Sequence, residues 1–406
     1  MTAEIMIMNK LAVALAADSA ATIAGNKVYQ SANKLFQLVL SEPVGFMVYG
    51  NDEFMGIPWE TVVSLYRSAS EGKSFDRLVD YANDFIKFLR EFPYLSITDE
   101  VVRVELAVDD LLKNFAQQVL QQSDPNNEPP SAQEVSLALA SMLENRLQEI
   151  ETYPLVAELP ADFEKAVVRQ CEPVIRDAVY RQFDELPDID TLLTSFQRLV
   201  VGSLVRGRLL PDSGIVLAGY GRLDVLPAMA ESQIFFRMLG EVAHTPVEMT
   251  ALSLDYTAQI RPFAQTEMVN AFMEGIDPDL NQHMLRAMEA KFAELLATVM
   301  QRLDVQDENI ARELQEISQG LLQNYLDEMK SYRLKGYIYP VMDAVAVLGK
   351  QDLAIMAETL VNLTAFKRRV SFDTESVGGD IDVAVISKID GFVWVKRKQY
   401  APNQLA

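Results

Sequence analysis

Short apolar runs open the chain and predict β-strands. Residues 2–8 and 11–17 are rich in Ile, Met, Val and Ala, and residues 27–40 predict a further pair of strand segments. Residues 44–49 carry one polar group, the hydroxyl of Tyr49, which is typical of a buried strand ending at Gly50. The first fifty residues therefore predict one part of a sheet.

The first two runs are joined by Asn9-Lys10, which indicates a hairpin with a two-residue loop. In that register the numbers of paired residues sum to 19, so Thr2 would lie opposite Ala17. Asp18 comes next in the chain. The hairpin therefore predicts a hydroxyl beside a carboxylate at one end of a sheet.

A helical pattern follows. Pro58 suits the first position of a helix, and residues 75–92 carry an apolar stripe of helical period. Residues 99–204 are mostly helical in pattern, with a Pro- and Asn-rich loop at 123–130. Ser131 and Glu134 then form a capping box that begins the next helix.

Strand patterns return late and close the chain. They cover residues 214–220, 234–236, 247–254, 381–386 and 392–396, and helical patterns cover 266–330 and 353–366. Strands at both ends with helices between them predict a layered domain. We expect its terminal strands to share a sheet and its middle to hold an insertion.

Composition excludes several function classes. The net charge of −22 argues against nucleic acid or an anionic membrane as the main partner. One cysteine, Cys171, and two histidines, His244 and His283, make a metal centre unexpected, and no cofactor motif is recognised. The N-terminus lacks a signal-peptide pattern and no long apolar run is present, so we expect a cytoplasmic protein.

The candidate chemistry begins at Thr2. Removal of Met1 would leave Thr2 with a free α-amine, which titrates near pH 8 and can act as a base for its own side-chain hydroxyl. A nearby cation would favour the neutral amine and stabilise charge developing on the oxygen. Lys34 is available for that role.

These residues resemble the N-terminal region of proteasome β-subunits and their bacterial relatives. The resemblance is carried by Thr2, by residues 17–19 (Ala-Asp-Ser) and by residues 34–37 (Lys-Leu-Phe-Gln), with spacings of 16 residues to Asp18 and 32 to Lys34. It implies that Thr2 is nucleophile and base together and that Asp18 holds Lys34. It also implies that the backbone N–H of Gly50 forms the oxyanion hole.

The resemblance returns later in the chain. Residues 214–221 (GIVLAGYG) are similar to the LLAGYD strand of that family, and residues 373–379 (DTESVGG) are similar to its DAYSGG segment, in which an Asp and a Ser support the nucleophile. One extra residue separates Ser376 from the Gly pair. Asp373 and Ser376 are therefore the first choice as supporting residues, with Thr374 and Val377 as the rival register.

The implied fold is an α+β, N-terminal-nucleophile (Ntn) hydrolase αββα sandwich with an added helical insertion domain. The expected segments are core residues 1–94, a helical insertion at 95–208, core strands at 209–262, an extended helical layer at 263–345 and core residues 346–406. The last segment combines a helix with the closing strands.

The implied function is threonine-type hydrolysis of peptide bonds in a peptide or unfolded protein. The resemblance also implies a homo-oligomer and is compatible with an ATPase unfoldase as partner. Two alternatives stay open. One is a non-catalytic scaffold whose insertion binds a partner, because proteasome-type subunits can keep the fold without activity. The other is an Ntn amidase that acts on a small-molecule amide, because the same chemistry serves both substrates.

Overall fold

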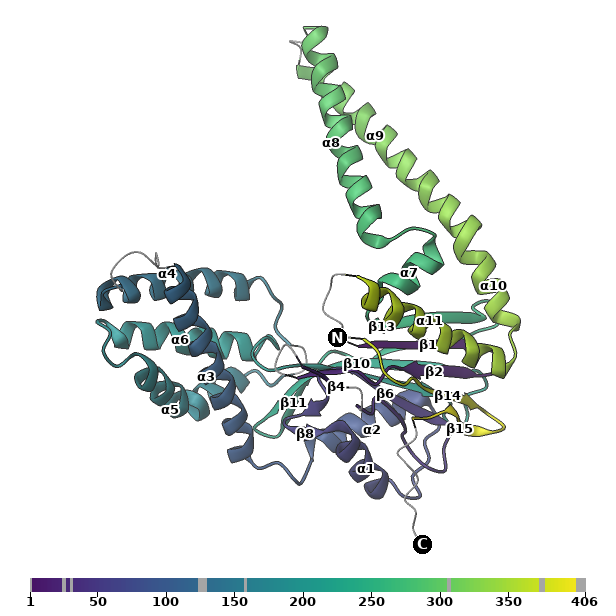
Figure 1. The fold of residues 1–406 in the computed structure, drawn as a ribbon, viewed down its shortest axis with the longest axis horizontal. Helices are drawn as coiled ribbons and strands as arrows, with labels where there is room; N and C mark the ends of the chain where they lie inside the picture. Colours follow the sequence, from purple (N-terminus) through teal and green to yellow (C-terminus); the bar gives the residue numbers. More distant parts are fainter. Residues whose placement is uncertain are drawn as a thin grey trace. The chain divides into compact units, whose positions relative to one another are not determined.

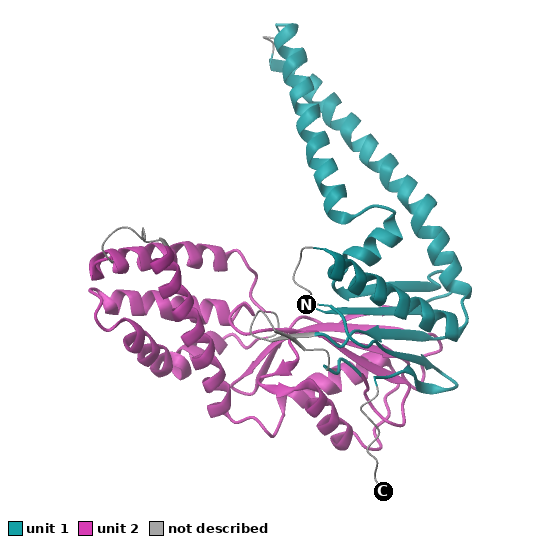
Figure 2. Cartoon of the chain, viewed as in Figure 1, with its two compact units in different colours: residues 1–35, 252–406 teal, residues 36–251 magenta. Residues whose placement is uncertain are grey.

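The computed structural model describes residues 2–23, 27–29, 32–122, 130–156, 159–304, 308–371 and 377–398. The chain forms two compact units, which Figure 2 distinguishes by colour. Unit 1 comprises residues 1–35 and 252–406, and unit 2 comprises residues 36–251. Both combine helices with antiparallel sheets, so the fold class is α+β.

Unit 1 is built on a five-stranded antiparallel sheet in the order β13-β1-β2-β14-β15 (Figure 1). Its strands are β1 (Ala3–Asn9), β2 (Val13–Ala17), β13 (Ala258–Ala264), β14 (Asp382–Ser387) and β15 (Gly391–Lys396). A two-stranded ribbon, β3 (Ala21–Ile23) and β4 (Lys27–Tyr29), belongs to the same unit. The prediction that the first and last strands share a sheet is confirmed.

Helix α11 (Lys350–Val370) packs against one face of this sheet (Figure 1). Ile5 and Ile7 of β1 share a core cluster with Leu353, Ala357 and Leu360 of the helix, and all five are buried. Alternate residues of a strand share a face, so this cluster accounts for one face of β1. The other residues of β1 are also buried, which is why the strand reads as a continuous apolar run.

The predicted register of the first hairpin was wrong by two residues. Glu4 pairs with Ala17, so the numbers of paired residues sum to 21, and the Asn9 N–H donates to the carbonyl of Ala12, which closes a turn with Lys10 and Leu11 at its tip. The Asn9 side chain accepts from the N–H of Leu11 and of Ala12, which stabilises the turn in this displaced register. A shift of two keeps every side chain on its predicted face.

Unit 2 is built on a second antiparallel sheet, in the order β11-β10-β9-β6-β5, with β12 pairing to β10. Its strands are β5 (Leu35–Gln37), β6 (Val44–Gly50), β9 (Ser213–Gly219), β10 (Ala228–Met238), β11 (Glu241–His244) and β12 (Glu248–Ala251), and a small ribbon is made by β7 (Glu53–Phe54) and β8 (Ile57–Pro58). Helices α1 (Trp59–Ala69) and α2 (Leu78–Arg90) share a buried cluster with this sheet. The helix start after Pro58 and the apolar stripe of α2 are as predicted.

Four further helices of unit 2 form a second core cluster, to which β10 and β11 also contribute. They are α3 (Ile97–Gln122), α4 (Ala132–Glu151), α5 (Phe163–Phe183) and α6 (Ile189–Leu204). The predicted capping box of α4 is confirmed, since Ser131 and Glu134 bond reciprocally. These helices fall within the expected insertion at residues 95–208. The two compact units divide elsewhere, after residues 35 and 251. The expected domain boundaries stay a prediction.

Unit 1 also carries a long helical hairpin. Its helices are α7 (Glu267–Glu274), α8 (Pro278–Arg302), α9 (Glu308–Arg333) and α10 (Tyr339–Val347), with a π-helical turn, η1 (Leu334–Ile338), before α10. No described residue of α8 or α9 is buried. In the part of the chain that the structure describes, no helix is long and apolar enough to cross a membrane.

The single cysteine provides a test of the helical core of unit 2. Cys171 is fully buried on α5, and burial raises the pKa of its thiol to about 11. Because the thiolate is the reactive species, we expect Ellman's reagent to modify Cys171 only after unfolding in denaturant. A Leu303→Cys variant, whose site is 68 % exposed, should add one thiol that reacts at once. Immediate modification of Cys171 in the native protein would contradict this packing.

Candidate active site around Thr2

Asp18 is the centre of a buried polar cluster in unit 1. It follows β2, and its Oδ1 accepts a hydrogen bond from the N–H of Ala3 at 3.1 Å. Its Oδ2 accepts one from the N–H of Gly378 at 2.9 Å. The Asp18 side chain is therefore fixed by the backbone at both ends of the described chain.

Lys34 supplies the positive charge of this cluster. Its Nζ lies 2.6 Å from Asp18 Oδ1 and 3.7 Å from Glu4 Oε1, and its side chain is 5 % exposed. Burying a lone ammonium group would be costly, and the two carboxylates offset that cost. The contact between Asp18 and Lys34 that the resemblance implies is thus present as a direct ion pair.

Thr2 lies next to this pair through Glu4. The Thr2 hydroxyl donates a hydrogen bond to Glu4 Oε2 at 3.0 Å. Thr2 directly precedes β1 and lies two residues before Glu4, so the two side chains project to the same side. The Thr2 carbonyl accepts from the N–H of Gln265, whose side chain is bonded by Arg368 of α11. Backbone and side-chain contacts therefore both orient Thr2.

Glu4 is a functional candidate that the sequence analysis missed. The opening run was read as apolar, although a carboxylate inside a buried strand is itself a signal, since such a group needs a partner. Its position two residues after Thr2 would have placed both side chains on one face. Glu4 links Thr2 to Lys34 in the structure.

Burial raises the pKa of the Glu4 carboxyl to about 8. Lys34 opposes this rise by attracting the ionised form, Asp18 adds to it by repulsion, and the Thr2 hydroxyl lowers the pKa by its hydrogen bond. Glu4 therefore holds a proton at neutral pH and releases it just above. A carboxyl group with such a pKa can exchange a proton with a neighbouring hydroxyl in the physiological range.

The predicted oxyanion residue, Gly50, belongs to unit 2. It ends β6 with φ of +87°, and a Cβ there would come within 2.8 Å of the carbonyl oxygen of Asp212. Glycine is therefore required for packing at this position, whatever else it does. Its role toward Thr2 stays a prediction.

The predicted supporting residues Asp373 and Ser376, with Thr374 of the rival register, lie outside the described residues. Val377, the other rival, is buried in the core beneath α11, where it packs as an apolar side chain. The adjacent Gly378 reaches Asp18 through its backbone N–H. Gly378 belongs to the segment 373–379 that carried the second part of the resemblance, and its backbone contacts the Thr2 cluster through Asp18.

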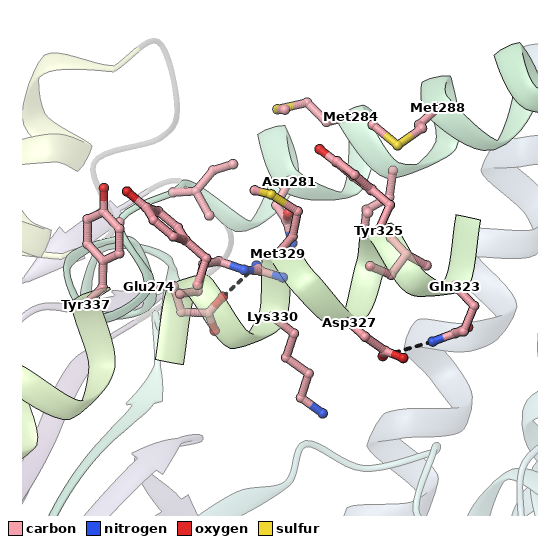
Figure 3. Close-up of a pocket in the computed structure, with 16 residues that line it drawn as sticks. Glu274, Asn281, Met284, Met288, Gln323, Tyr325, Asp327, Met329, Lys330 and Tyr337 are labelled. Atoms are coloured by element: carbon pink, nitrogen blue, oxygen red, sulfur yellow. Dashed lines mark hydrogen bonds and ion pairs between the residues drawn. The ribbon is translucent and has the colours of Figure 1, made fainter. Parts of the chain in front are cut away.

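A second candidate site is a hollow of about 430 Å³ among α7, α8, α9 and η1 (Figure 3). Met284, Met288 and Tyr325 line it, and Arg333 pairs with Glu274 at 3.2 Å. Its described lining contains none of the predicted site residues. An apolar hollow with one ion pair suits packing or binding better than acyl transfer.

The histidines offer no rival centre. His244 ends β11, is buried, and its Nδ1 lies 2.7 Å from the carbonyl oxygen of Thr245, whereas His283 is exposed on α8. Among the described residues no group of three or more His, Cys, Asp or Glu side chains is placed to hold a metal ion. Of the described groups, the Thr2 cluster best combines a nucleophile, a proton acceptor and a cation.

Comparison with known proteins adds little. No known protein family and no curated protein matches the sequence. Among solved structures, the chain is similar to "Anbu (ancestral beta-subunit) from Yersinia bercovieri", with a TM-score of 0.28 and 9 % identity over 98 % of this chain and 88 % of that one. That likeness is weak, and the proposals below rest on the geometry around Thr2.

The raised pKa of Glu4 predicts a pH-dependent stability. Between about pH 4.5 and 8 the folded protein holds a proton on Glu4 that the unfolded chain has lost. The protonated Glu4 therefore adds to the free energy of unfolding. This stabilisation is complete below pH 4.5 and is lost as the pH rises toward 8, by up to about 1.4 kcal/mol per pH unit. Glu4→Gln should remove it, so the difference in urea midpoint between variant and wild type should change with pH.

The matched control is Glu313→Gln, which changes an exposed carboxyl of α9. Its urea midpoint should follow that of the wild type at pH 5, 6.5 and 8. A Glu4→Gln variant whose midpoint differs from the wild type by the same amount at all three values would contradict a raised Glu4 pKa.

Proposed function

We propose that this protein is an N-terminal-nucleophile hydrolase of the proteasome β-subunit type, with Thr2 as nucleophile and a peptide or unfolded protein as substrate. One observation carries the proposal: Thr2, Glu4, Lys34 and Asp18 form a continuous buried network at the start of the chain. Each unit contributes an antiparallel sheet with helices on it, which is compatible with the αββα sandwich of that family.

The chemistry follows from the positions of these groups. Thr2 Oγ1 attacks the scissile carbonyl, and its proton passes to a nearby base. In the family that base is the α-amine freed by removal of Met1. Lys34, oriented by Asp18, stabilises the negative charge that develops during attack. Water then releases the acyl group, and Gly50 stays the candidate donor to the oxyanion.

The alternative of a non-catalytic scaffold is favoured by one observation. Thr2 is only 6 % exposed, so a substrate must displace the groups that cover its hydroxyl. A proteasome-like subunit without activity would tolerate such burial. A small-molecule amidase would need less room than a peptidase, and substrate profiling separates these two.

We also propose that the protein assembles through α9 with a second copy of itself. Ile310, Leu314, Ile317 and Leu321 recur at intervals of four and three residues, the spacing of a coiled-coil seam. Ile310, Ile317 and Leu321 are each about half exposed. Such a seam is unstable in water without a partner.

The hairpin carries a small part of the negative charge of the chain. Helix α8 carries three acidic and three basic side chains, and α9 carries five acidic and three basic, so the pair has a net charge of −2. The whole chain carries −22. Two copies that meet at this hairpin therefore each bring a small share of the charge of the chain to the interface. An ATPase unfoldase partner remains part of the proposal by resemblance alone.

Covalent labelling tests the nucleophile. A peptide epoxyketone forms its adduct with a free N-terminal Thr, so protein lacking Met1 should gain one adduct by intact mass. Thr2→Ala should gain none, because the attacking oxygen is gone. Thr298→Ala, which changes an exposed α8 hydroxyl bonded to its own helix, should label like the wild type. Equal labelling of Thr2→Ala would contradict the proposal.

Sedimentation velocity tests the assembly. At micromolar concentration we expect the wild type to sediment as an oligomer and a double variant, Ile317→Glu with Leu321→Glu, to sediment as a monomer, because charges would face each other across the seam. Leu137→Glu, at a site 69 % exposed on α4, is the matched control. A monomeric wild type, or an unchanged double variant, would contradict self-assembly through α9.

A further inference from the structure

We infer that the Glu4 carboxylate is the base that takes the proton from the Thr2 hydroxyl, so that this site does not require a free α-amine. The inference deepens the proposed function and rests on it. It is carried by the direct hydrogen bond from Thr2 Oγ1 to Glu4 Oε2 at 3.0 Å, within the reach expected of a nucleophile and its base.

The second support is the way in which Glu4 is held. It lies on β1, an interior strand flanked by β13 and β2, and it is 2 % exposed. Its Oε1 accepts no hydrogen bond among the described residues and lies 3.7 Å from Lys34 Nζ. One carboxylate oxygen therefore faces the hydroxyl and the other faces a cation, which is the arrangement of an oriented base.

Lys34 and Asp18 complete the arrangement. Asp18 holds Lys34 at 2.6 Å, and Lys34 stabilises the ionised form of Glu4 that accepts the proton. The strand neighbours of Glu4 are Phe263 on β13 and Ala17 on β2, which exclude water and add no charge. Because the pKa of Glu4 lies near 8, the ionised form that accepts the proton is the minor form at neutral pH and becomes the major form as the pH rises through 8.

The steps balance as follows. As Thr2 Oγ1 bonds to the carbonyl carbon of the substrate, the hydroxyl proton moves to Glu4 Oε2. The π electrons of that carbonyl move to the carbonyl oxygen. When the C–N bond breaks, Glu4 returns the proton to the leaving amine. A water molecule then attacks the ester while Glu4 takes its proton, and Thr2 regains that proton as its oxygen leaves.

The test compares two full-length forms, one with Met1 retained, made with methionine aminopeptidase inhibited, and one with Met1 removed by that enzyme. The probe is a β-lactone, which acylates a hydroxyl without needing an amine. We expect both forms to be acylated at Thr2, and Glu4→Gln to slow acylation of both by about 10²- to 10⁴-fold. Glu313→Gln should leave the rate unchanged.

The two hypotheses fail differently. Acylation of the Met1-free form alone would overturn the role of Glu4 and leave the Thr2 hydrolase intact, and this result needs no variant to fold. Unchanged acylation of folded Glu4→Gln would do the same. Absence of a Thr2 adduct in both wild-type forms would overturn the hydrolase itself, and the role of Glu4 with it.

Discussion

The contact between Lys34 and Asp18 is the interaction on which the site depends. Asp18 joins the N–H of Ala3 near the start of the chain to that of Gly378 near its end, and Lys34 neutralises the carboxylate that makes both bonds. Without the lysine, Asp18 would be a buried charge without a cation within reach among the described residues. The position of Thr2 follows from this anchor, because β1 begins at the bonded Ala3.

The same cluster creates an electrostatic conflict that Glu4 resolves. Two carboxylates and one ammonium group in a buried site leave one negative charge in excess, and desolvation makes that charge expensive. The carboxyl of Glu4 responds by keeping its proton up to about pH 8. Ionised Glu4 destabilises the fold, and the same ionised carboxylate is the proposed base. Such opposition between stability and function is typical of functional sites.

Much of this site could be predicted from the sequence, for physical reasons. The hairpin pattern placed Thr2 near Asp18, and the family resemblance implied that Asp18 holds Lys34. The wrong hairpin register did not change this, because a shift of two preserves the faces of a strand. Glu4 was missed because the apolar residues around it dominated the pattern. The role of Gly50 could not be read locally, because it depends on tertiary contacts between segments far apart in the chain.

A crystal structure of the protein after treatment with the β-lactone is the most direct test of the central claim. The account predicts an ester bond to Thr2 Oγ1, with the Glu4 carboxyl within hydrogen-bond distance of that oxygen and Lys34 still paired with Asp18. An unmodified Thr2, or a modified Thr2 from which Glu4 has turned away, would contradict it.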